Sequence, residues 1–203
     1  MKVDALMTQS KSDLYRRVAE LHIANINQGF LSTLGIGFVS LMYQAIDECD
    51  DAVLLVAHVN GQAVGFVAGG AGMGSIYRRM LRYWPRLFLE LLPSAFSLSR
   101  VRRIFEILRY SRSGGVSTLP AAEFLSIAVD PTFRGQGHAQ SIYGELCTHF
   151  RQRGVPAFKI VVGAALAPAH QFYQRMGASA VEQIAVHQGE SSTVYVQTLS
   201  AAK

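Results

Sequence analysis

The chain has 203 residues, of which 50% are hydrophobic and 16% are charged, and its formal net charge is +5. This composition excludes a disordered chain, and the length suits one domain with a single core, expected here over residues 1–203. Two cysteines are too few for a disulfide scaffold, and no Cys/His cluster indicates a metal site. Because we find neither a secretory leader nor an apolar run long enough to cross a membrane, we expect a cytoplasmic protein.

Hydrophobic periodicity and turn residues predict the elements of the first half of the chain. They are a strand over 3–8, a helix from Ser10 or Ser12 to Asn25, a second helix around 38–45, and strands over 53–59 and 62–68. Asn60-Gly61 between the two strands is a hairpin signal. The segment GGAGMG that follows lacks the third glycine of a dinucleotide fingerprint, so we expect it to be only the exit from a strand.

Positive charge is concentrated in residues 71–118, which hold nine Arg and two Glu and therefore carry a net charge of +7. Apolar spacing over 75–112 predicts two amphipathic helices, with Pro93 at the break between them. An insertion of this length inside a compact domain is usually functional. Four roles are open: a lid over an acceptor pocket, a peripheral membrane contact, a surface for self-association or nucleic acid, or a packed helical pair with a solvated Arg face. The sequence gives no firm nucleic-acid signal.

The second half of the chain alternates strands and helices. It is predicted to contain a strand over 124–129, a helix from about 139 that Gly154 and Pro156 end, a strand over 157–162, a helix over 167–175, and strands over 179–187 and 192–199. This order of elements predicts a mixed α/β sheet.

The sequence RGQGHA lies between the strand over 124–129 and the helix that follows. Glycines remove side-chain bulk where another group must approach the backbone. The first N–H groups of a helix have no internal acceptor, so together with the helix dipole they favour an anion such as a pyrophosphate. Arg134 adds a positive charge there. The alternative is an ordinary tight turn, and a P-loop is excluded because no Gly-Lys-Ser/Thr follows.

The stretch EFLSIAVDPTFRGQGHAQSIYGEL resembles motif A of the GNAT superfamily of acyl-CoA-dependent N-acyltransferases, in which a strand leads into Q/R-x-x-G-x-G/A at a helix start. Arg134, Gly137 and Ala139 match that signature, and AHQFYQRMG is similar to a second motif of the family. The resemblance implies an α/β fold with a mostly antiparallel central sheet, a V-shaped splay between two strands, helices on both faces, and here a helical insertion before the motif A strand. It also implies acetyl-CoA as co-substrate.

The resemblance assigns cofactor contacts residue by residue. The pantetheine arm would add to the open edge of the motif A strand, and the pyrophosphate would rest on the loop. The implied residues are Ile127, Ala128, Val129, Arg134, Gly135, Gln136, Gly137, His138, Ala139 and Gln140. Two departures from the family pattern, Leu166 in place of Asn and Ala178 in place of Phe, put the acceptor pocket in doubt.

Two residues occupy positions that the family uses for proton transfer. Tyr173 matches its general-acid tyrosine, with a half-buried structural aromatic as the alternative. Glu123 stands where the histone-acetylating branch has its base, with a solvated strand-end glutamate as the alternative.

A polar cluster at the end of the first helix borders the acceptor side in the family. It contains His22, Asn25, Asn27 and Gln28, and lies beside Phe30. These residues are candidate acceptor contacts, although helix-end polar residues are more often caps.

Taken together, the sequence predicts an N-acetyltransferase that moves an acetyl group to the amine of a small molecule. A small acceptor is favoured over a protein tail because a lid-like insertion would obstruct a broad peptide groove. The alternative is a non-catalytic acyl-CoA sensor or an Arg-rich interaction module.

Overall fold

The computed structural model describes residues 10–26, 30–95, 119–187 and 190–199. The strand expected over 3–8 lies outside these residues. So do residues 96–118, the second part of the basic insertion.

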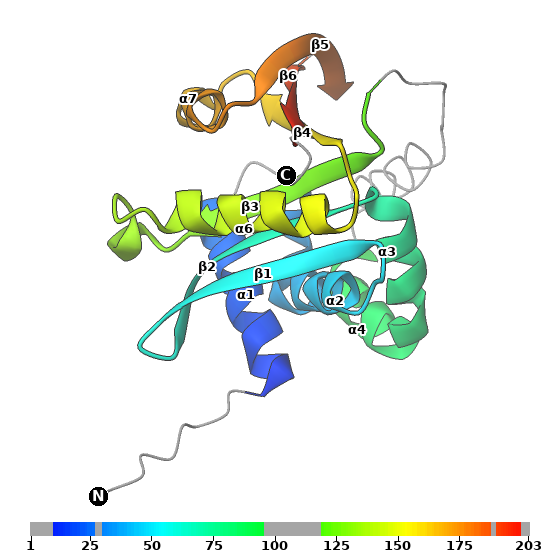
Figure 1. Ribbon diagram of the computed structural model, residues 1–203. Helices are drawn as coiled ribbons and strands as arrows, with labels where there is room; N and C mark the ends of the chain where they lie inside the picture. Colours follow the sequence, from blue (N-terminus) through cyan, green and yellow to red (C-terminus); the bar gives the residue numbers. More distant parts are fainter. Residues whose placement is uncertain (1–9, 27–29, 96–118, 188–189, 200–203) are drawn as a thin grey trace, which may run out of the picture.

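The first two helices begin and end close to where the sequence places them (Figure 1). Helix α1 spans Lys11–Asn25, and the Ser10 side chain caps it by accepting a hydrogen bond from the Asp13 N–H at 3.2 Å. A short 3₁₀ turn, η1 (Phe30–Leu34), leads into helix α2 (Gly35–Asp47). The two helices pack against each other and against one face of the sheet.

The sheet has six strands in the order β1-β2-β3-β4-β6-β5. Their bounds are β1 Ala52–Val59, β2 Gln62–Gly70, β3 Ala122–Val129, β4 Ala157–Gly163, β5 Ser179–His187 and β6 Glu190–Thr198. Every neighbouring pair is antiparallel except β3 and β4. Asn60 (φ 50°) and Gly61 (φ 78°) both adopt positive φ, as the predicted hairpin between β1 and β2 requires.

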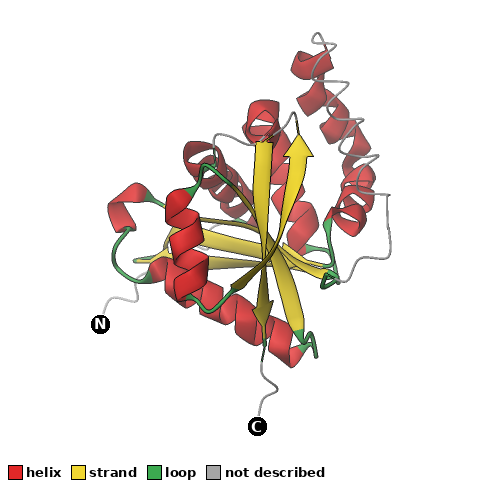
Figure 2. Ribbon diagram, turned by 90° about the horizontal axis from the view of Figure 1, so that it is seen from above, coloured by secondary structure: helices red, strands yellow, loops and turns green. Residues whose placement is uncertain are grey.

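Strands β3 and β4 pair over only three positions, from Ala122–Phe158 to Phe124–Ile160, and then part. The register of β3 against β2 shifts at the same point, so that Leu125 forms a bulge between Phe124 and Ser126. The remainder of β3 therefore keeps β2 on one side and has an open edge on the other. Figure 2 shows the strands of the two halves crossing at a large angle, which confirms the predicted splay.

Helices cover both faces of the sheet, and each face has its own core. Helices α1 and α2, with the insertion, enclose one cluster that includes Tyr43, Phe66 and Ala128. Helices α6 (His138–Gln152) and α7 (Ala167–Arg175) enclose a second cluster that includes Phe124, Tyr143 and Tyr173. Residues of β3 therefore contribute to both cores, so that side chains on β3 lie on either face of the sheet.

The insertion begins with helix α3 (Met73–Met80), a 3₁₀ turn η2 (Leu81–Tyr83) and helix α4 (Trp84–Ala95). Pro93 does not interrupt α4, which runs through it to Ala95, and the helix expected after it lies outside the described residues. An interruption that the sequence did not predict falls at η2, and Pro85 then occupies the first turn of α4, a position that suits a residue without an N–H. Ile76 and Met80 anchor α3 in the first core, and none of the described helices is long and apolar enough to cross a membrane.

The diglycine at the end of β2 serves packing. A Cβ on Gly69 would lie 2.8 Å from the Phe150 ring of α6, and one on Gly70 would lie 2.9 Å from Ala52 Cβ. Gly70 also pairs with Glu123 at the start of β3. These close approaches explain the two glycines, and they agree with the expected strand exit.

Candidate active site

The loop between β3 and α6 is fixed at its start by an aspartate. Asp130 accepts hydrogen bonds from the Thr132 N–H (3.1 Å) and the Thr132 hydroxyl (2.7 Å), which caps the 3₁₀ turn η3 (Pro131–Phe133). Arg17 of α1 forms an ion pair with the same carboxylate at 2.8 Å. The Thr132 hydrogen bonds, with a smaller effect from Arg17, lower the pKa of Asp130, so the anchor stays ionised near neutral pH.

Arg134 ties the loop to the first helix. Its Nε donates to the Val129 carbonyl at 3.2 Å, and its Nη2 donates to the side-chain oxygen of Asn25 at the end of α1. Asn25 in turn donates to the Leu21 carbonyl at 2.7 Å. The guanidinium therefore lies at the end of β3 as a fixed positive charge, and Asn25, a predicted acceptor contact, is engaged in holding it there.

Two left-handed glycines turn the loop into α6. Gly135 has a φ of +75° and Gly137, the N-cap residue, a φ of +84°, which residues with a Cβ rarely adopt. The Ser141 N–H donates to the Gly137 carbonyl at 3.0 Å. The N–H groups of His138, Ala139 and Gln140 have no acceptor among the described residues, as expected for the first turn of a helix. Phe133 packs edge-on against His138 at 6.2 Å beside them.

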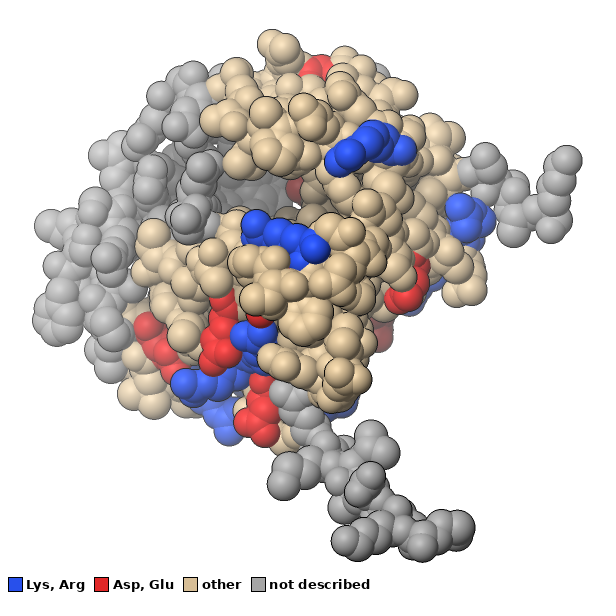
Figure 3. All heavy atoms as spheres, turned by 90° about the vertical axis from the view of Figure 1, so that its left-hand side faces the viewer, with Lys and Arg blue, Asp and Glu red and all other residues tan. Residues whose placement is uncertain are grey.

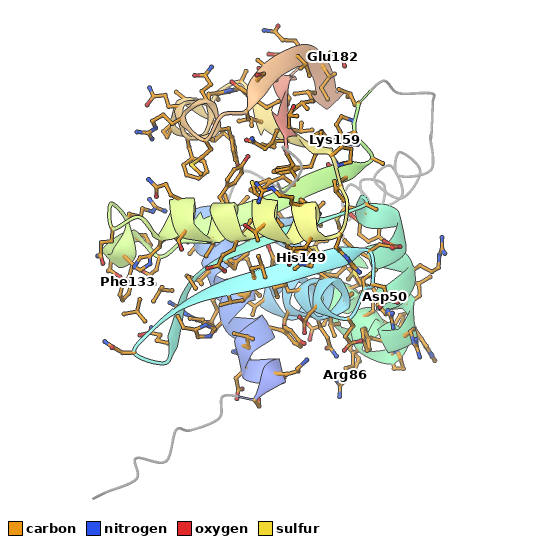
Figure 4. The ribbon with its side chains drawn as sticks, in the orientation of Figure 1. Asp50, Arg86, Phe133, His149, Lys159 and Glu182 are labelled. Atoms are coloured by element: carbon orange, nitrogen blue, oxygen red, sulfur yellow. The ribbon has the colours of Figure 1, made fainter. Side chains whose placement is uncertain are left out.

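The open edge of β3 runs from the bulge to this loop. Ile127, Ala128 and Val129 pair with β2 and have no partner on β4. In Figure 4 the labelled Phe133 marks the loop end of the splay, and Lys159 marks the end where β3 and β4 still pair. The surface is hollowed between these two halves of the molecule when it is seen from the side of the loop (Figure 3).

Tyr173 of α7 lies in the second core and is 5% exposed. Its ring packs edge-on against Phe124 at 5.3 Å, directly before the bulge. Its hydroxyl makes no hydrogen bond within the described residues. Burial raises the pKa of Tyr173 far above its ordinary value of 10.0, so the hydroxyl keeps its proton.

Glu123 lies on β3 beside Lys159 of β4, with 3.7 Å between Oε2 and Nζ. Burial raises the pKa of the Glu123 carboxyl above its ordinary value of 4.5, while the Lys159 ammonium opposes the shift. Tyr77 of the insertion is close enough that the Glu123 charge, after burial, contributes to raising its pKa to about 12. The first insertion helix therefore borders this carboxylate.

The predicted acceptor-side residues are only partly brought together. Asn27 and Gln28 lie outside the described residues, and only the backbone of Phe30 is described. His22 is 4% exposed, and its Nδ1 lies 2.7 Å from the Tyr43 hydroxyl. The Tyr43 hydroxyl lies 3.0 Å from Ser126 Oγ on β3.

Sequence reasoning missed three residues of this region. Tyr43 and Ser126 carry no motif, and only their contact in the fold relates them to His22. The sequence placed Lys159 in a strand without giving it a role, although a lysine on the strand next to Glu123 could have indicated an ion pair with that carboxylate. The two departures from the family pattern occupy plain structural positions, since Leu166 is the N-cap of α7 and Ala178 is buried in the second core.

The splayed pair, the glycine turn and the free amides at a helix start are the arrangement of an acyl-CoA-dependent transferase. The model of the acetyltransferase (GNAT) family matches residues 23–178, and the chain belongs to that family. It is therefore an acyltransferase of the kind that uses acetyl-CoA. A search of curated proteins gave no match.

Solved structures of low sequence identity share the fold. A GNAT-family protein from Desulfovibrio desulfuricans is 14% identical, with a TM-score of 0.58 over 97% of this chain and 96% of that one. An N-acetyltransferase from Staphylococcus aureus is 16% identical, with a TM-score of 0.57 over 94% and 95%. An aminoglycoside 6'-N-acetyltransferase in complex with coenzyme A is 10% identical, with a TM-score of 0.57 over 94% and 93%.

Proposed function

We propose that the protein transfers an acetyl group from acetyl-CoA to the amine of a small-molecule acceptor by direct attack. The observation that carries this proposal is the continuity of three features: the open edge of β3, the left-handed turn through Gly135 and Gly137, and the free amides at the start of α6. A diphosphate suits the amides and Arg134, and an extended pantetheine arm suits an unpaired strand edge.

The residues present fit acetyl-CoA at both ends. At the loop, a Cβ on either Gly135 or Gly137 would meet no atom within 4 Å, so the backbone there is accessible to a bulky anion. At the bulge, the edge of β3 from Ile127 to Val129 is unpaired on the β4 side. When bound, acetyl-CoA supplies an electrophilic thioester carbon and a thiol of pKa about 8.5 as leaving group.

The two candidate catalytic residues lie on opposite faces of β3. Glu123 is next to Tyr77, which packs on the first core, and Tyr173 packs in the second core against Phe124. An acceptor amine is protonated near pH 7, and a carboxylate with a raised pKa is a stronger base for taking that proton, directly or through water. Tyr173 keeps a proton on the other face, where a leaving thiolate would need one.

A small acceptor is supported by the position of the insertion. Its first helix places Tyr77 beside Glu123 and anchors Ile76 in the core. A rigid helix next to the proposed base narrows the acceptor side, and a narrow site suits a compact amine better than an extended peptide.

The experiment is a free-thiol release assay with acetyl-CoA and four acceptor classes: amino sugars, amino acids, polyamines and peptides. We expect turnover with at least one small amine, and calorimetric binding of coenzyme A by the unmodified protein. Turnover with peptides alone would overturn the small-molecule acceptor. Absence of coenzyme A binding would overturn the cofactor site as a whole.

A further inference from the structure

A line of three hydrogen-bonding side chains runs from the first core to the open part of β3. His22 Nδ1 lies 2.7 Å from Tyr43 Oη, and Tyr43 Oη lies 3.0 Å from Ser126 Oγ. His22 and Tyr43 are buried, with 4% and 0% of their surface exposed, whereas Ser126 is half-buried. Neither His22 nor Tyr43 can touch a ligand directly, so any effect on one must pass through Ser126.

Ser126 stands at the point where the splay opens. It follows the Leu125 bulge, and the last residue of β3 that pairs with β4 is Phe124. Its hydroxyl contacts Tyr43, a residue of the first core, so its side chain lies on the face of β3 that also carries Glu123 beside Tyr77. An amine that approaches this face near the bulge therefore meets the Ser126 hydroxyl.

The direction of the hydrogen bonds follows from the chemistry of the three groups. A phenol O–H is a stronger acid than an imidazole N–H, and an imidazole nitrogen is a stronger base than a phenol oxygen. By geometry alone either member of each pair can be the donor; these strengths favour the arrangement in which Tyr43 donates to His22 Nδ1 and Ser126 donates to Tyr43. With its one proton committed inward, Ser126 Oγ is left with lone pairs that can only accept.

His22 is held neutral in this arrangement. Its ring stacks on Phe66 at 6.4 Å in the core, and burial lowers its pKa to about 4. A neutral ring that accepts at Nδ1 carries its proton on Nε2, the atom that has no partner within the described residues. Leaving that N–H unpaired is costly, and an imidazolium would be costlier still. The neutral His22 thus sets the direction of the two hydrogen bonds through Tyr43 to Ser126, and it is unsuited to take up a proton.

We propose that Ser126 binds the acceptor amine by accepting a hydrogen bond from its N–H group, and that Tyr43 and His22 are positioning residues that hold the serine hydroxyl in the accepting direction. The inference rests on the proposed amine acetylation and adds a binding contact on the acceptor side. An acceptor nitrogen held by one N–H at Ser126 can turn its lone pair toward the thioester, while Glu123 on the same face takes the proton that the amine must lose.

The test is a kinetic comparison of Ser126→Ala with the unmodified protein, using the amine of highest turnover in the thiol-release panel. We expect kcat/KM for that amine to fall about tenfold, the loss of one hydrogen bond to a nitrogen that becomes positively charged, with KM for acetyl-CoA unchanged. Ser40→Ala, a half-buried serine of α2 outside the chain of contacts, is the matched control and should behave as wild type. An unchanged kcat/KM in Ser126→Ala would overturn the inference.

The positioning role has its own readouts. His22→Asn keeps an acceptor atom near the position of Nδ1 and should retain more acceptor affinity than His22→Leu, which keeps none. In the intact protein, ¹⁵N NMR should show the proton of His22 on Nε2, whereas a proton on Nδ1 would reverse the chain and refute the accepting role of Ser126. If the unmodified protein turns over no amine while still binding coenzyme A, the proposed function fails, and this inference fails with it. If wild type acetylates the amine and Ser126→Ala has the same kcat/KM, only the inference about Ser126 fails and the proposed function stands.

Discussion

Replacing Gly137 by alanine tests the loop on which the cofactor site depends. Gly137 is the N-cap of α6 and adopts a φ of +84°, and an added Cβ would meet no atom within 4 Å. The change therefore introduces no clash, and its cost is the left-handed backbone alone, about 1–2 kcal/mol for a residue with a Cβ. For a domain of this size we expect the melting temperature to fall by about 2–8 °C.

Gly154 provides a control for that strain. It lies at the opposite end of α6, adopts a φ of +71°, and also has no atom within 4 Å of an added Cβ. Gly154→Ala should therefore lose about 1–2 kcal/mol of stability as well. The two variants differ only in their place along the helix, since Gly154 lies away from the free amides of the first turn.

Coenzyme A binding separates the two variants. An alanine at position 137 that keeps the positive φ puts a Cβ into the open space proposed for the diphosphate, and one that relaxes to negative φ re-aims the N–H groups of His138 and Ala139. Losing one hydrogen bond to a charged oxygen costs about 1.5–3 kcal/mol, so we expect calorimetry to show Kd for coenzyme A raised by about 10- to 150-fold in Gly137→Ala. Gly154→Ala should bind as wild type. Equal affinities in the two variants would refute the assignment of the diphosphate to this helix start.

Four further substitutions address the proposed catalytic groups and the packing. Tyr173→Phe should lower kcat by about 10- to 100-fold without changing coenzyme A affinity or stability, because the hydroxyl makes no bond within the described residues; full activity would exclude the acid role. In wild type, kcat/KM should rise with pH through the raised pKa of Glu123, and Glu123→Gln should remove that rise. Lys159→Met should move the rise to higher pH, because it removes the positive charge that lowers the pKa of Glu123. A pH profile of kcat/KM that is unaltered in Glu123→Gln would contradict the base role. The free energy of unfolding should fall as pH increases from 4.5 through the raised pKa of Glu123, because the folded state binds the carboxyl proton more tightly than the unfolded chain does. Urea titrations across this pH range should show the fall in wild type and not in Glu123→Gln. Gly69→Ala should lose about 1–3 kcal/mol of unfolding free energy through overpacking against Phe150, with normal coenzyme A binding, and a loss of binding in its place would give the diglycine a role in the site.

Local sequence patterns predicted several elements of this fold correctly. The start of α1 follows from a serine whose side chain caps the next turn, and the β1–β2 hairpin from two residues that tolerate positive φ. The helix start at the end of RGQGHA, where α6 begins at His138, follows from glycines at the turn and apolar spacing beyond it. Each of these signals acts within a few residues, so the residues themselves carry it, and the same stretch was enough to indicate the family.

Tertiary contacts decided what the local patterns could not. The bulge at Leu125 arises from the register of β3 against β2, and it turns Ser126 toward Tyr43, 83 residues away in sequence. Arg134 donates a hydrogen bond to Asn25, which is 109 residues away in sequence. Pro93 lies within α4, because a proline is only disfavoured in a helix and does not by itself end one, and no proline or glycine lies within η2 to signal the interruption there. Pairings between distant segments leave no periodic trace in the chain, since they depend on which strand edges and helix faces meet once the core has formed.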